Sequence, residues 1–62
     1  MKLELTRDNV FQLTATAQEL SALVGAARMS LEAMEHDEHA PKELVALLRR
    51  ILREYDSALE RI

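Results

Sequence analysis

Residues 10–34 read VFQLTATAQELSALVGAARMSLEAM, and this stretch decides the predicted fold. Its apolar side chains recur at alternating intervals of three and four residues, which is the a/d pattern of helices that pack side by side. The row consists of Val10, Leu13, Ala17, Leu20, Val24, Ala27, Leu31 and Met34. We therefore predict one long helix over residues 7–35, whose first turn Thr6 or Asp8 can cap.

The segments on either side of this helix complete the predicted architecture. Residues 2–6 alternate polar and apolar side chains, which is typical of a half-buried strand, and a two-fold related copy of the strand is one candidate to pair with it. Proline disfavours helical geometry in the residue before it and suits the first position of a new helix. Because Pro41 is the only proline, we predict a turn over residues 36–40 and a second helix over residues 41–61.

The second predicted helix carries a broad apolar face. One row repeats at intervals of four and three residues and consists of Leu44, Leu48, Ile51, Tyr55, Ala58 and Ile62. A neighbouring row, seven residues apart, consists of Val45, Leu52 and Leu59, and Leu47 widens the face further. A face this broad is wider than one partner helix requires, and it favours a helix that touches two neighbours.

Length and composition limit how this chain can become stable. It has 62 residues, no cysteine and a mass of 7.1 kDa, which corresponds to a single domain over residues 1–62 without disulfides. A chain this short buries only about 60% of the surface that its unfolded form exposes. Self-association would bury the remaining apolar surface, so we predict a homodimer.

We accordingly predict an all-α fold, in which an antiparallel helical hairpin with a short N-terminal strand dimerises into a four-helix bundle. The length and the helix plan resemble the small antiparallel helical hairpins that form such bundles, a resemblance that carries no functional residue with it. The order of the hairpins in the dimer, parallel or antiparallel, stays open. The predicted dimer or partner interface comprises Phe11, Leu13, Leu20, Val24, Leu31, Leu47, Leu48, Ile51, Leu52 and Tyr55.

The same features predict a binding function. We find no glycine-rich phosphate loop and no nucleophile close to a histidine in sequence, so we expect no enzymatic activity and no cofactor. No apolar run is long enough for a secretory signal or a membrane span, and we expect a cytoplasmic protein that does not bind membranes. The leading hypothesis is a protein–protein interaction or regulatory module that binds itself and another protein.

One alternative is a nucleic-acid-binding helical dimer. Arg49, Arg50 and Arg53 form the only basic cluster, and a two-fold axis would present the cluster twice to a phosphate backbone or an acidic partner. Against this alternative, the net charge is −3 and no aromatic side chain lies near the cluster to stack on bases.

A weaker alternative is a metal-responsive helical protein. His36 and His39 lie three residues apart among carboxylates, and imidazole together with carboxylate oxygen can bind a divalent ion. The Glu-x-x-His motif of di-iron bundles is missing, because Ala33 precedes His36 at that offset. The cluster also falls in the predicted turn, where acidic polar residues are ordinary, so we assign no metal site here.

Overall fold

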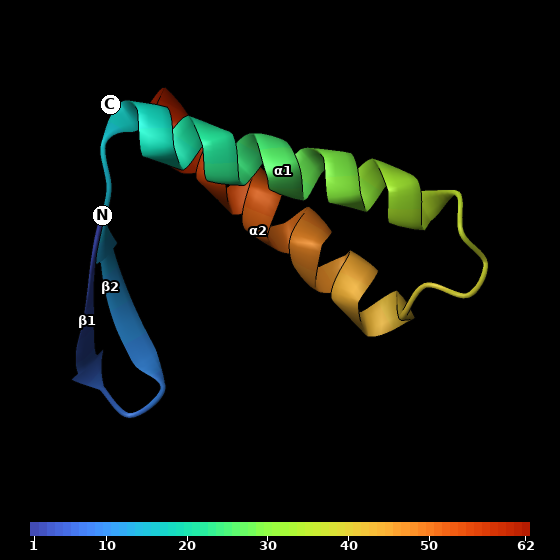
Figure 1. Cartoon of the computed structure of the whole chain (residues 1–62), viewed down its shortest axis with the longest axis horizontal. Coiled ribbons are helices and arrows are strands. Elements are labelled where there is room, and N and C mark those ends of the chain that lie inside the picture. Colours follow the sequence, from blue (N-terminus) through green and yellow to red (C-terminus); the bar gives the residue numbers. More distant parts are fainter.

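The computed structural model describes residues 1–62 and shows a mixed α/β fold with four elements (Figure 1). Two antiparallel strands, β1 (Lys2–Arg7) and β2 (Val10–Thr14), form a hairpin at the N-terminus. Two helices of 19 residues each, α1 (Ala17–Glu35) and α2 (Lys42–Glu60), form a second, helical hairpin. Neither helix is long and apolar enough to cross a membrane.

The prediction of an all-α fold is therefore wrong, and the error lies in residues 7–16. The helix predicted over residues 7–35 begins at Ala17, because residues 10–14 form β2 and pair with the strand before them. Val10 and Leu13 fit the three-and-four spacing of a helix, but Phe11 and Leu13 fit the alternation of a strand equally well. Strand pairing within the chain decides between the two patterns, and β1 needs no second copy to pair with.

A tight turn at Asp8 and Asn9 closes the β-hairpin. Asn9 adopts a left-handed conformation with φ 59°, which asparagine tolerates better than other non-glycine residues. The register then shifts between Leu5 and Arg7, which marks a bulge beside the turn, and the Thr6 hydroxyl donates to the Val10 carbonyl at 3.0 Å. The turn thus explains why the chain reverses here rather than entering a helix.

We predict that Asn9→Ala weakens the β-hairpin by about 1 kcal/mol, because alanine pays the full steric cost of the left-handed conformation. NMR chemical shifts and cross-strand contacts in β1 and β2 measure the hairpin population. Asn9→Gly is the control and should keep or strengthen the hairpin. Equal hairpin populations in the alanine and glycine variants would contradict this role of Asn9.

A capping box fixes the start of α1. The Glu19 amide donates to the Thr16 hydroxyl at 3.1 Å, and the Thr16 amide donates to the Glu19 carboxylate at 2.9 Å. The amino group of Met1 lies 3.2 Å from the same carboxylate. The Thr16 amide and this amino group hold the pKa of Glu19 below its ordinary value. The same acidic side chain therefore ties the first residue of the β-hairpin region to the start of the helix.

The small core lies between the two helices. Val45 and Leu52 of α2 are the only buried side chains, with 9% and 6% of their surface exposed. The half-buried side chains around them are Leu20, Val24, Ala27, Leu31 and Met34 of α1 and Leu48 and Tyr55 of α2. On α2, the row that contains Val45 and Leu52 therefore packs most deeply. Leu44 and Ile51, which belong to the neighbouring row that begins at Leu44, stay exposed.

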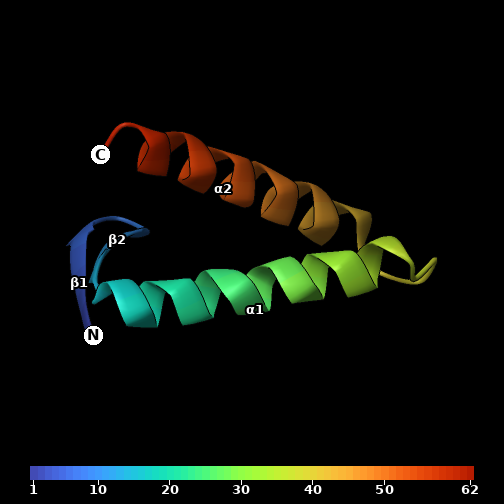
Figure 2. The same cartoon turned by 90° about the horizontal axis from the view of Figure 1, so that it is seen from above.

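The molecule has the shape of a hook. The β-hairpin stands steeply to the helix pair at the end where α1 begins, and the loop between the helices lies at the opposite end (Figures 1 and 2). No Cα atom of β1 or β2 lies within 8 Å of a Cα atom of either helix. The radius of gyration is 13.4 Å, whereas a compact chain of this length would have about 11 Å.

Candidate interaction surfaces

Four exposed leucine and phenylalanine side chains of the β-hairpin share one face of the sheet. The register pairs Leu3 with Leu13 and Leu5 with Phe11, and residues that pair directly across two strands lie on the same face. Their neighbours Lys2, Glu4, Gln12 and Thr14 therefore lie on the other face. All four members of the apolar face are exposed, and Phe11 exposes 60% of its surface. We call Leu3, Leu5, Phe11 and Leu13 the hairpin face.

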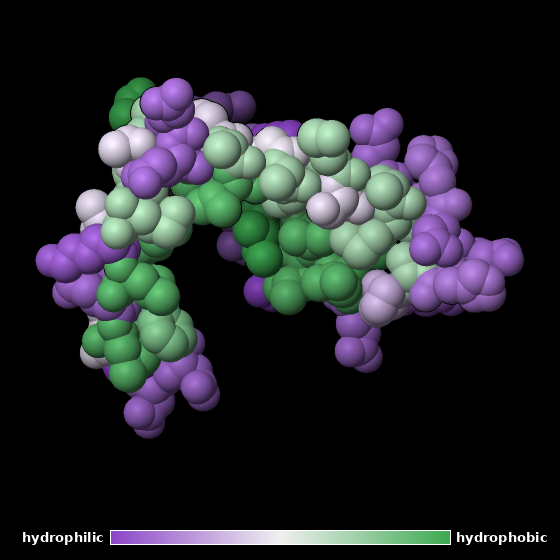
Figure 3. All heavy atoms as spheres, in the orientation of Figure 1, coloured by the Kyte–Doolittle hydropathy of each residue, from purple (hydrophilic) through white to green (hydrophobic).

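A second exposed apolar surface lies on the helix pair. Leu44, Leu47 and Ile51 follow one another at helical spacing on α2, and Leu23 of α1 is exposed as well. Leu47 and Ile51 expose 42% and 46% of their surface. We call Leu23, Leu44, Leu47 and Ile51 the helix face. Figure 3 shows apolar atoms on the hairpin and on the part of the helix pair that borders the notch between them.

The opposite side of the helix pair is charged. Arg49, Arg53 and Asp56 also follow helical spacing on α2, and they flank the buried Val45–Leu52 row on the side away from Leu44 and Ile51. They line an open groove together with Arg28, Leu31, Glu32, Glu35, Leu52, Ser57 and Glu60. The helix pair therefore has one apolar side and one side of mixed charge.

Ion pairs across this groove join the two helices. Arg28 donates to the Asp56 carboxylate, and Arg49 donates to one Glu35 oxygen through Nε at 2.9 Å and Nη2 at 2.6 Å. All four side chains are well exposed, so each pair contributes at most about 1 kcal/mol to stability. The pairs therefore add little to the stability that burial of Val45 and Leu52 supplies.

The predicted basic cluster does not form a uniform basic patch. Arg49 pairs with Glu35, and Arg50 lies 3.8 Å from Glu54 one turn along the same helix. Arg53 makes no ion pair, but it lines a groove in which four carboxylates accompany three arginines. A phosphate backbone needs a surface with excess positive charge, and no observation here favours nucleic-acid binding over protein binding.

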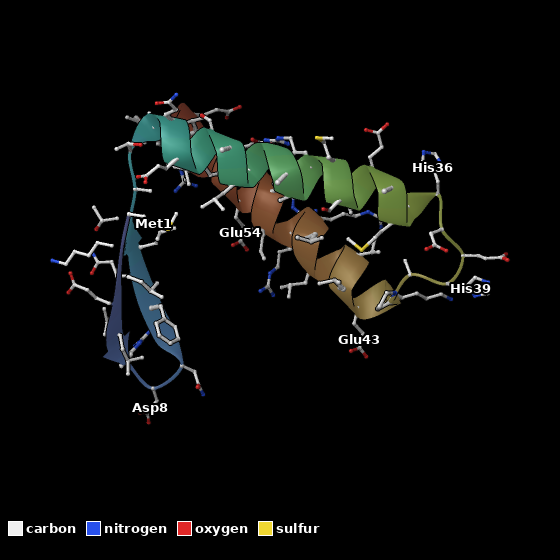
Figure 4. The ribbon with its side chains drawn as sticks, in the orientation of Figure 1. Met1, Asp8, His36, His39, Glu43 and Glu54 are labelled. Carbon is white, nitrogen blue, oxygen red and sulfur yellow. The ribbon has the colours of Figure 1, made fainter.

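The two histidines lie in the loop that joins the helices. Asp37 accepts a hydrogen bond from the His39 amide at 2.9 Å, and its carbonyl accepts from the Ala40 amide at 3.1 Å. The side chains of His36 and His39 point in different directions at this end of the molecule (Figure 4). The loop brings no group of three or more metal-ligating side chains together. We therefore carry no metal site forward.

The structure divides the predicted interface residues into two sets. Leu20, Val24, Leu31, Leu48, Leu52 and Tyr55 are at least half-buried within the chain's own helix pair. Phe11, Leu13, Leu47 and Ile51 stay exposed. The predicted helix contains Phe11 and Leu13 and the predicted interface lacks Leu3 and Leu5, although apolar alternation on both sides of the Asp8-Asn9 turn is a hairpin signal.

Comparisons of the chain with protein-family models, with curated proteins and with solved structures found no match.

Proposed function

We propose that this chain is a small, non-enzymatic protein-interaction module that acts as a homodimer. The observation that carries the proposal is the surface that one copy exposes. Its accessible area is 5518 Å², whereas a compact folded protein of this mass exposes about 4,100 Å². One copy thus exposes roughly 1,400 Å² more than expected, and the exposed side chains include most of its large apolar residues.

The size of this excess suits a permanent dimer. Two separate copies expose about 11,000 Å², and a compact particle of twice the mass exposes about 6,800 Å². The difference of about 4,200 Å² falls in the range of obligate homodimer interfaces, which bury about 2,000–5,000 Å². The helix face supplies the centre of such an interface, because Leu44, Leu47 and Ile51 form an uninterrupted stripe.

We infer that the charged groove binds a further protein partner. It lies on the side of the helix pair opposite the helix face, so a dimer built on the helix face leaves it accessible. Its paired Arg49–Glu35 and Arg28–Asp56 side chains offer donors and acceptors of both signs. Polar rims of mixed sign are typical of surfaces that recognise proteins and confer specificity more than affinity.

Sedimentation equilibrium of the full chain tests the dimer. We expect a particle of twice the 7.1 kDa chain mass at tens of micromolar, because an interface of obligate size dissociates only at much lower concentration. A single species of 7.1 kDa at that concentration, with a far-UV spectrum of folded helix, would contradict the proposal.

A further inference from the structure

We propose that the β-hairpin is an arm that packs its hairpin face onto the helix face of a second copy. This inference rests on the homodimer proposed above and adds which surfaces meet in it. The occupant of the hairpin face comes from outside the chain, because the Cα atoms of β1 and β2 stay more than 8 Å from those of both helices and the face is exposed. A two-stranded hairpin is at best marginally stable in water by itself, so its four exposed apolar side chains require a cover.

The junction with α1 keeps the arm away from its own helices. Only Ala15 and Thr16 separate β2 from α1, and Thr16 is held by the capping box with Glu19. The Met1 amino group bonds to the same Glu19 carboxylate from the β1 side. These contacts fix the steep angle at which the β-hairpin leaves the helix pair (Figure 1). Folding the arm back would move the Met1 amino group away from the Glu19 carboxylate.

The length of the arm suits a second helical layer. A strand of six residues spans about 20 Å, whereas a layer of packed helices is about 10 Å thick. The arm therefore extends well beyond the helices of its own chain, on the side where apolar atoms line the notch (Figure 3). An arm of this length can therefore reach across the helix face of a second copy that docks at the notch.

A second copy is the occupant that the surfaces fit best. Each copy supplies one arm and one helix face. In a dimer with a two-fold axis, each arm covers the helix face of the partner, and the same contact occurs twice. The arm and the helix face thus complete one interface between copies.

Substitution of Phe11 tests the arm. Phe11→Thr keeps a side chain that favours strands but removes the largest apolar group of the hairpin face. Because the group is lost at two symmetric places, we expect the dimer dissociation constant to rise at least about 100-fold by sedimentation equilibrium. Gln12→Thr is the matched control, because it introduces the same residue at the adjacent position of β2, on the opposite face of the sheet. It should change the dimer dissociation constant by no more than about three-fold.

The outcomes separate the two proposals. A wild-type chain that is monomeric overturns the homodimer and the arm with it. A wild-type dimer whose dissociation constant is the same for Phe11→Thr and Gln12→Thr overturns the arm alone. Circular dichroism of dilute Phe11→Thr checks that the helix pair remains folded, which we expect because the Phe11 side chain is exposed within the chain.

A crosslink placed at Phe11 provides an independent measurement on an otherwise unchanged chain. We expect p-benzoylphenylalanine at this position, in a mixture of ¹⁴N and ¹⁵N chains, to yield crosslinks between chains that map to the segments around Leu23 and around Leu44–Ile51. Crosslinks confined to the same chain, or to the β-hairpin of the second copy, overturn the proposal.

Discussion

Leu52→Ala is expected to abolish most of the stability of the helix pair. Leu52 exposes only 6% of its surface and is one of two buried side chains in the molecule, so no larger core can compensate for its loss. Truncation of a buried leucine to alanine costs about 2–5 kcal/mol. A domain of this length has a total stability of only about 3–9 kcal/mol, so the loss amounts to a large fraction of the whole.

Urea unfolding followed by circular dichroism at 222 nm measures this effect, with every variant at the same chain concentration because a dimer's stability depends on it. Met29→Ala is the matched control: it also removes a large side chain from a helix, but 74% of the Met29 surface is already exposed. We expect the control to change stability by no more than about 0.5 kcal/mol. A loss below about 1 kcal/mol for Leu52→Ala would show that the Val45–Leu52 row is not the core.

The sequence predicted the helical part of this fold because the apolar spacing there has only one interpretation. Leu20, Val24, Leu31 and Met34 form a row that fits a helix and does not fit a strand, and they lie against α2. Prediction failed in residues 7–16, where a short segment fits both patterns. Two local signals favoured the correct boundary: the alternation on both sides of Asp8-Asn9, and the spacing of Thr16 and Glu19, which is that of a capping box.

The candidate surfaces depend on details that periodicity does not contain. The sequence predicts a broad apolar face on α2, but two neighbouring rows compete for the inside of the helix pair. The ion pairs Arg28–Asp56 and Arg49–Glu35 connect the two helices along the charged groove. In this arrangement Val45 and Leu52 of α2 point between the helices and are buried. This rotation leaves Leu44, Leu47 and Ile51 exposed, and only the packed helices reveal it.

Leu47→Glu, at the middle of the helix face, is expected to convert the dimer into a folded monomer. Leu47 is 42% exposed within the chain and glutamate is a good helix former, so the helix pair should keep its structure. In the dimer the same position lies in the apolar centre, where an unpaired carboxylate is costly and occurs twice by symmetry. We expect the dissociation constant to rise at least about 1,000-fold.

Ser57→Glu is the matched control for this effect. It adds the same single charge to the same helix, but Ser57 lines the charged groove on the side away from Leu47. We expect it to remain dimeric by sedimentation equilibrium, with an unchanged helical spectrum. If Leu47→Glu also remains dimeric, the helix face cannot be the centre of the interface, because a dimer that tolerates two added carboxylates there must bury some other part of the chain.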